Sequence, residues 1–111
     1  MIVTITINPA IDRTYSVDRL AFEDRAYINS SKESPGGRGI NASCVINSFG
    51  GPTLAVLVSG GDSGKRMEEQ LRACCFPIQV VPIEKPIRTN VTITDRHGLT
   101  VNLNEAGPEL T

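Results

Sequence analysis

The sequence of 111 residues has no tryptophan, one histidine and three cysteines, and the shortages of histidine and cysteine each exclude a class of protein. Cys74 and Cys75 are adjacent to each other, Cys44 stands apart, and none has CxxC spacing, so the odd set does not suit a disulfide framework. His97 has no metal-ligand companions, and we expect no metal site. The cysteines are predicted to be buried free thiols, which indicates a reducing compartment and a cytoplasmic location.

The sequence also has no large net charge of either sign and no long apolar run. Eleven Lys and Arg residues oppose twelve Asp and Glu residues, which gives a formal net charge of −1. This balance argues against a nucleic-acid or anionic-membrane partner, so any basic site must be local. No apolar run approaches the roughly 20 residues of a membrane span, and residues 1–8 lack the basic leader of a signal peptide.

Apolar periodicity predicts a single domain in which strands and helices alternate. The expected elements are strands at 2–8, 53–59 and 78–83, helices at 39–49 and 62–74, polar strands at 15–17 and 26–32, and a hairpin of 88–95 and 99–104. Gly50 and Gly51 should end the first helix and Asp62 should cap the second. The order indicates an α/β fold with a mainly parallel sheet, and the polar strands suit an exposed flap. The apolar strand at 53–59 is expected to be covered on both faces.

The octapeptide SPGGRGIN, at residues 34–41, lies where an extended run gives way to a helix. Its three glycines permit a positive φ and let a ligand approach the main chain closely. The N–H groups of the following helix, together with Arg38, favour a phosphate or carboxylate. A tight strand-to-helix turn without a ligand is an equally good interpretation of these residues alone.

Two further side chains are candidates for ligand binding. Asp12 follows the first strand in the sequence NPAID, and ligands of open α/β sheets bind outside the carboxyl ends of strands. It could accept a hydrogen bond from a substrate hydroxyl, or it could be an ordinary turn aspartate. Arg88 opens the hairpin, where its guanidinium could clamp a phosphate or could be a solvated charge on an edge strand.

The segment SGGDSGKR, at residues 59–66, resembles a phosphate-binding P-loop but departs from its pattern. Ser59 replaces the first glycine, and Arg66 replaces the serine or threonine that would hold magnesium. We therefore interpret the segment as a turn that leads into a helix, and we expect no nucleotide to bind there.

Six motifs in a fixed order resemble the start of the phosphofructokinase-B branch of the ribokinase-like sugar kinases. They are NPAID, a pair of flap strands, PGGRGIN, SGGDSG, IRTNVTITD and LTVNLNEAGP. Within that branch the chain looks most like the 1-phosphofructokinase and tagatose-6-phosphate kinase group. The resemblance implies the amino-terminal part of a three-layer fold, residues 1–111 forming the substrate-binding portion, with flap strands at about 13–33 and 88–104.

The resemblance also implies roles for individual residues in binding a sugar phosphate. Asp12 would hold sugar hydroxyls, and Gly37 and Asn41 would line the sugar pocket. Arg88 would contact the sugar phosphate, and Arg25, in the flap, would also reach it. Arg38 stands where many relatives have lysine, which keeps the charge but changes its geometry.

In this family the catalytic GAGD-like turn and the nucleotide-binding part lie further along a longer chain. ATP and Mg²⁺ are therefore expected in the complete enzyme and not on this chain, which would lack a catalytic residue and be inactive alone. Asp62 is not expected to be a catalytic base. The implied partners are the carboxyl-terminal part of the kinase and a second copy through the flap strands. A stand-alone module that binds a sugar phosphate or small anion is the alternative, and a structural fragment without activity is a third.

Overall fold

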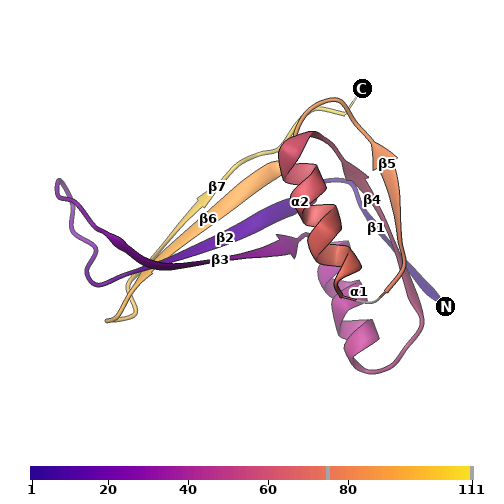
Figure 1. Ribbon diagram of the computed structural model, residues 1–111, viewed down its shortest axis with the longest axis horizontal. Coiled ribbons are helices and arrows are strands. Elements are labelled where there is room, and N and C mark those ends of the chain that lie inside the picture. The colour runs from indigo at the N-terminus through magenta and orange to yellow at the C-terminus, as the bar shows by residue number, and fades with distance from the viewer. Residues whose placement is uncertain (75, 111) are drawn as a thin grey trace.

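The computed structural model describes residues 1–74 and 76–110, which form two sheets and two helices (Figure 1). The main sheet is parallel and has the strand order β1-β4-β5, from β1 (Ile2–Thr6), β4 (Thr53–Ser59) and β5 (Ile78–Pro82). The flap sheet is mixed and has the order β3-β2-β6-β7, from β2 (Ala10–Val17), β3 (Ile28–Gly36), β6 (Arg88–Asp95) and β7 (Thr100–Asn104). The helices are α1 (Arg38–Ser48) and α2 (Gly61–Arg72).

The predicted α/β class is confirmed, but the flap strands are longer than their composition suggests. β1 ends at Thr6, and a new strand begins at Ala10 instead of residue 15. β3 continues through Pro35 to Gly36, beyond the predicted end at residue 32. β2 pairs with β3 on one side and β6 on the other, so ladder hydrogen bonds on both sides override its polar composition.

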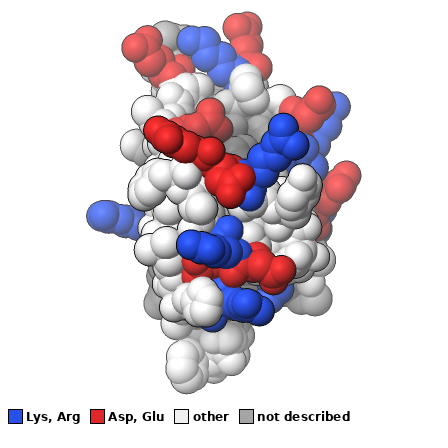
Figure 2. All heavy atoms as spheres, turned by 90° about the vertical axis from the view of Figure 1, so that its left-hand side faces the viewer, with Lys and Arg blue, Asp and Glu red and all other residues white. Residues whose placement is uncertain are grey.

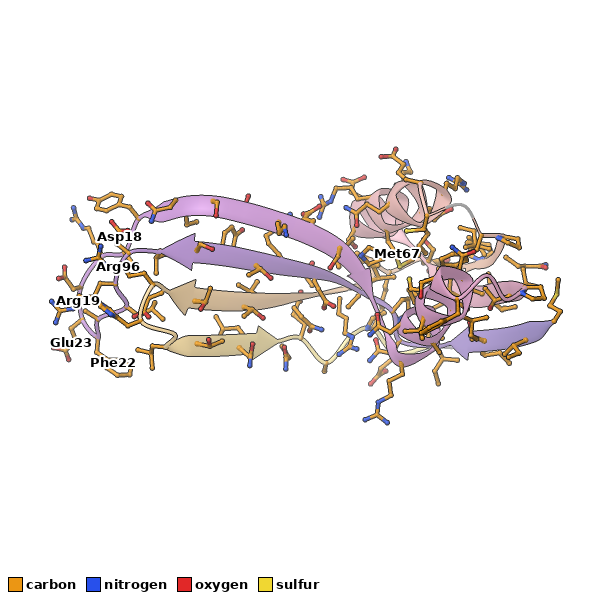
Figure 3. The ribbon with its side chains drawn as sticks, turned by 90° about the horizontal axis from the view of Figure 1, so that it is seen from below. Asp18, Arg19, Phe22, Glu23, Met67 and Arg96 are labelled. Carbon is orange, nitrogen blue, oxygen red and sulfur yellow. The ribbon has the colours of Figure 1, made fainter. Side chains whose placement is uncertain are left out.

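The hydrophobic core lies between the main sheet, the helices and the base of the flap sheet. Its buried members are Ile11, Ile40, Ala55, Leu57, Met67, Leu71, Phe76 and Ile87. The flap extends away from this core, and the molecule measures 48 × 35 × 18 Å along its principal axes (Figure 1). Figure 3 places the fully buried Met67 in the helix-bearing half, away from the flap tip.

One face of the main sheet is open. Both helices lie on the same side of the sheet (Figure 1), and in β4 they bury Thr53, Ala55, Leu57 and Ser59. The alternate residues of β4 are only half-buried, and on β1 the exposed fractions of Val3 and Ile5 are 53% and 69%. The prediction of cover on both faces is therefore wrong for the described residues, because they include no helix on the second face.

The predicted end of α1 is confirmed, whereas the predicted cap of α2 is wrong. Gly50 has a φ of 78°, and its N–H and that of Gly51 bond to carbonyls of the last turn of α1, as a glycine cap should. Asp62 is not the cap of α2: the helix begins at Gly61, with Gly60 preceding it. Gly60 packs so closely on the backbone of residues 83–85 that a Cβ would lie 2.3 Å from the Lys85 carbonyl oxygen. The carbonyl of Gly60 accepts the N–H of Gly64 at 3.1 Å, so the helical hydrogen bonds begin before Asp62.

The prediction of buried thiols is wrong for Cys74 and is met only in part by Cys44. Cys44 is half-buried, Cys74 is exposed, and both are free thiols. Cys74 lies just beyond the last turn of α2, where the chain turns at the surface, so the core does not enclose it. The prediction for Cys75 falls outside the described residues. Within the described part of the chain, no helix is long and apolar enough to cross a membrane.

Candidate sugar-phosphate site

The centre of the candidate site is a hydrogen-bonded pair, Asp12 and Asn90. β2 and β6 run in parallel as neighbours, and their register sets Asp12 opposite Asn90. The side-chain nitrogen of Asn90 donates a hydrogen bond to Asp12 Oδ1 at 3.2 Å. Asp12 is therefore an orientated, half-buried strand residue and not a turn aspartate. Asn90 was not among the predicted site residues, although it stands beside Arg88 in the motif RTN.

The glycines of the octapeptide have separate structural causes. At Gly36 a Cβ would lie 2.2 Å from Asp12 Oδ2, so the missing side chain makes room for the carboxylate. Gly37 has a φ of 130°, and a Cβ there would lie 2.7 Å from Thr6 Cγ2. At Gly39 a Cβ would lie 2.4 Å from Thr6 Oγ1, so this glycine lets α1 pack on β1. Packing therefore accounts for much of the glycine content that suggested a ligand.

The amino terminus of α1 lies next to Asp12, because Gly36 touches the aspartate and the helix begins two positions later at Arg38. The first helical bond runs from the N–H of Asn41 to the carbonyl of Gly37, at 2.8 Å. In the described structure Gly37 makes no side-chain cap, and the first turn of α1 has no acidic residue. The first N–H groups of α1 thus keep their hydrogen-bonding capacity and a partial positive charge. The side chains of Arg38 and Asn41 are exposed.

Arg88 lies on the same face of the flap sheet as the Asp12 and Asn90 pair. Its Cα pairs with Ala10, two positions along from the Asp12 pairing, and strand residues two apart point to the same face. Among residues 1–74 and 76–110, Arg88 Nε and Asn90 Oδ1 are buried atoms without a hydrogen-bond partner. A buried polar atom without a partner costs about 1–3 kcal/mol, which a bound ligand could recover. β6 lies between β2 and β7, but its ladder with β7 ends at Asn90, so Arg88 has a strand neighbour on the β2 side alone.

Arg25 is not brought to this site within one chain. It is exposed in the loop that joins β2 to β3, at the flap tip. From Asp12 to the end of β2 the strand spans about 17 Å, at roughly 3.3 Å per residue. Figure 3 shows the tip, with Asp18, Arg19, Phe22, Glu23 and Arg96, at the end remote from the helices. Figure 2 looks onto this end and shows basic and acidic side chains mixed, without a patch of one sign.

An ion-paired cluster joins the base of the flap to α2. Glu33 of β3 bonds to Arg13 of β2, accepts a hydrogen bond from Gln70 at 3.2 Å and lies 3.7 Å from Arg66 Nε. The hydrogen bond from Arg13 is the main cause that lowers the pKa of Glu33, while burial opposes it. This cluster connects the flap strands β2 and β3 to α2.

Two polar residues next to the strands that carry the site, Glu105 and Asn8, were not identified from the sequence. Glu105 Oε1 accepts a hydrogen bond from the backbone N–H of Thr89 at 2.8 Å. The side-chain nitrogen of Asn8 donates to the carbonyl of Ala106 at 3.0 Å. Both residues belong to quoted motifs, NPAID and LTVNLNEAGP, but no spacing rule predicts these partners. Within the described ranges, no group of three or more His, Cys, Asp or Glu residues could hold a metal ion.

The structure combines parallel βαβ units with a flap sheet. Asp12 lies where the two sheets meet, beside the uncapped start of α1. This arrangement is a ribokinase-like α/β fold. The sequence model for pfkB family carbohydrate kinases matches residues 1–108. The chain therefore belongs to the pfkB family of carbohydrate kinases.

Solved structures agree with this assignment. The chain superposes on phosphofructokinase-2 from Escherichia coli in complex with fructose-6-phosphate with a TM-score of 0.92, at 24% identity, over 98% of this chain and 36% of that one. On a possible 1-phosphofructokinase from Thermotoga maritima the TM-score is 0.88, at 32% identity, over 99% and 36%. The first likeness shows the fold, and the second adds similarity in sequence.

Curated relatives are sugar-phosphate kinases. The chain is 32% identical to the ATP-dependent 6-phosphofructokinase isozyme 2 of Mycobacterium tuberculosis, over 85% of this chain and 28% of the relative. It is 27% identical to the tagatose-6-phosphate kinase of Staphylococcus epidermidis, over 99% and 35%. The chain thus spans about a third of the length of the relatives it matches.

Proposed function

We propose that residues 1–111 form the sugar-phosphate-binding part and flap of an ATP-dependent sugar-phosphate kinase. The observation that carries the proposal is the set of unsatisfied polar groups around Asp12: the uncapped start of α1, Arg88 Nε and Asn90 Oδ1. The substrate is a phosphorylated ketose, such as tagatose 6-phosphate or a fructose phosphate. Its hydroxyls and its phosphate supply the acceptors and donors that these groups need.

Each residue has a separate part in binding. Asp12, orientated by Asn90, accepts a hydrogen bond from a sugar hydroxyl. Gly37 and Asn41 present the start of α1 to the sugar, and Arg88 neutralises the phosphate. Arg38, exposed beside them, adjusts the choice of sugar.

In the complete enzyme Mg²⁺-bound ATP supplies the phosphoryl group that the sugar hydroxyl attacks. Catalysis of this reaction depends on position and on charge neutralisation, so the contribution of this chain is to hold the sugar still. The groups that bind ATP and Mg²⁺ belong to the carboxyl-terminal part, and the 111-residue chain alone has no turnover.

Calorimetric titration of the chain with tagatose 6-phosphate, fructose 6-phosphate and fructose 1-phosphate tests the binding site. We expect binding to one of them that weakens at least about tenfold in Asp12→Asn and in Arg88→Ala, since each change removes a charge-assisted hydrogen bond. Arg96→Ala, at the flap tip, is the control and keeps wild-type affinity. Absence of binding to all three sugars, or an unchanged affinity in Arg88→Ala, contradicts the proposal.

A second candidate is a module that binds a sugar phosphate without chemistry, because all the site residues except Arg25 come together in this chain. A chimera separates the two functions, with residues 1–111 in place of the matching part of the T. maritima relative. ATP-dependent phosphorylation of the sugar by the chimera supports the kinase. Binding by a folded chimera without turnover supports the module.

We also propose that two copies associate through the flap. The flap face opposite Asp12 includes Val101 and Leu103 of β7, which are 39% and 56% exposed. A contact between Arg25 and the sugar phosphate requires this second copy, since Arg25 is remote from Arg88 in its own chain. Leu103→Lys should lower the degree of association in analytical ultracentrifugation, whereas Asn102→Lys, on the other face of β7, should not. Equal sedimentation of the two variants argues against the flap dimer.

A further inference from the structure

The segment that follows β7, residues 105–107, passes the start of β6 and reaches Asn8. The β6–β7 ladder ends with Asn90 opposite Asn104, so the next pair along would be Thr89 and Glu105. The backbone of β7 diverges there, and the Glu105 carboxylate takes the place of a ladder carbonyl, accepting the N–H of Thr89 at 2.8 Å. A hydrogen bond to a carboxylate is shorter and stronger than one between neutral groups.

The same segment also contacts Asn8, which lies two residues before the start of β2. Asn8 donates its side-chain N–H to the carbonyl of Ala106 at 3.0 Å. Gly107, with a φ of 94°, lies so close to this side chain that a Cβ would sit 2.3 Å from Asn8 Oδ1. The contact therefore depends on the absence of a side chain at Gly107, in a conformation that glycine adopts without strain.

These contacts connect the two strands that carry the candidate site. Thr89 lies between Arg88 and Asn90 on β6, and Asn8 precedes the start of β2, which carries Asp12. The hydrogen bonds of Glu105 and Asn8 go to the backbone of neighbouring residues and not to the Asp12 and Asn90 pair itself. They tie the first residues of β6 and the residue that leads into β2 to the same segment, beside the Ala10–Arg88 end of the ladder between the two strands.

We propose that Glu105 is a positioning residue for sugar-phosphate binding, acting with Asn8 through residues 105–107. Glu105 holds the β6 backbone so that Arg88 and Asn90 keep their places opposite Asp12. The inference rests on the proposed function for its effect on affinity, but the positioning itself is visible without a ligand. A bond that merely ended the sheet would leave the Asp12 and Asn90 pair unaffected when removed.

The ligand-free test is nuclear magnetic resonance of the full 111-residue chain as wild type, Glu105→Ala and Glu105→Gln. In Glu105→Ala we expect hydrogen exchange of the Thr89 amide to rise about tenfold or more, because its acceptor is lost. The side-chain amide signals of Asn90, which report its bond to Asp12, should shift at the same time. Glu105→Gln keeps an acceptor oxygen and should restore both signals, and Glu109→Ala, further along the same segment, is the matched control.

The second readout is affinity for the sugar phosphate that the wild-type chain binds. We expect Glu105→Ala to weaken binding about fivefold to tenfold, and Glu105→Gln to recover most of it. A wild-type chain that binds no sugar phosphate contradicts the proposed function, and the Asn90 signals then decide the positioning on their own. Unchanged Asn90 signals in Glu105→Ala overturn the inference, whatever the affinity.

Discussion

Gly36 shows how one missing side chain can shape this site. Its φ is not in the left-handed region, so alanine could adopt the backbone conformation. The obstacle is steric, because a Cβ would lie 2.2 Å from Asp12 Oδ2 and 2.7 Å from its Cγ. The glycine is therefore required by the aspartate and not by the turn.

Gly36→Ala should displace the Asp12 carboxylate from Asn90. We expect a loss of about 1–3 kcal/mol in the free energy of unfolding, typical of overpacking, and a weaker affinity for the sugar phosphate. Urea denaturation and calorimetry measure the two effects. Ser30→Ala, at an exposed position of the same strand, is the control. Unchanged stability and affinity in Gly36→Ala would show that Asp12 adapts without cost.

The two described cysteines should differ in reactivity. Burial, helped by the neighbouring Cys74, raises the pKa of the Cys44 thiol, whereas Cys74 is exposed. Because the thiolate is the reactive form, an alkylating reagent should modify Cys74 before Cys44. Mass spectrometry of a Cys75→Ser variant during alkylation follows both sites. Equal rates for the two cysteines would contradict the burial of Cys44.

Among the elements, the flap tip depends on one carboxylate. Asp95, the last residue of β6, accepts backbone N–H bonds from Leu20, His97 and Leu99. Burial acts most strongly on the pKa of Asp95 and would raise it, but these three hydrogen bonds together lower it below its ordinary value. Asp95 therefore joins the β2–β3 loop to the β6–β7 turn while it is ionised.

Acid should loosen the tip before it unfolds the core. The pKa of Asp95 is lower in the folded chain than in the unfolded one, so its stabilising effect is present above the unfolded pKa and is lost as the pH falls through the lower folded value. Hydrogen exchange at Leu20 and Leu99, relative to Leu57 in the core, should rise over that range. In Asp95→Asn the extra exchange should already be present at neutral pH. Equal hydrogen exchange at Leu20 and Leu99 in the wild type and in Asp95→Asn at neutral pH contradicts this role.

For the molecule as a whole, the open face of the main sheet is the dominant feature. Val3 and Ile5 of β1 are exposed there, beside half-buried residues of β4. Exposed apolar faces and unpaired sheet edges favour self-association. In longer relatives about two-thirds of the protein lies outside the part that this chain matches, and that part could cover the face.

We expect the 111-residue chain to form oligomers or to be poorly soluble. Ile5→Lys should reduce this association, because it places a charge on the open face. Val45→Lys, at a similarly exposed position on α1, should have no effect. Analytical ultracentrifugation measures both variants, and a sharp wild-type monomer at all concentrations contradicts the prediction.

Much of the architecture followed from local patterns, and the errors have physical causes. The apolar run of β4 and the glycines after α1 each specify a strand or a helix end within a few residues. Flap strand β2 was underestimated because its polar residues have low strand preference on their own, and pairing on both sides stabilises it. The roles of Asn90 and Glu105 could not be predicted, since their partners depend on strand register.

The order of elements and the candidates Asp12 and Arg88 were thus available from residue types and periodicity, because these properties are local. Only the tertiary structure showed that Asn90 donates a hydrogen bond to Asp12 and that Gly36 contacts the same carboxylate. It also showed that Arg25 lies at the far end of the flap. Each of these depends on which strand lies beside which. Register between β2 and β6 is decided by long-range packing, and no single segment of the chain contains it.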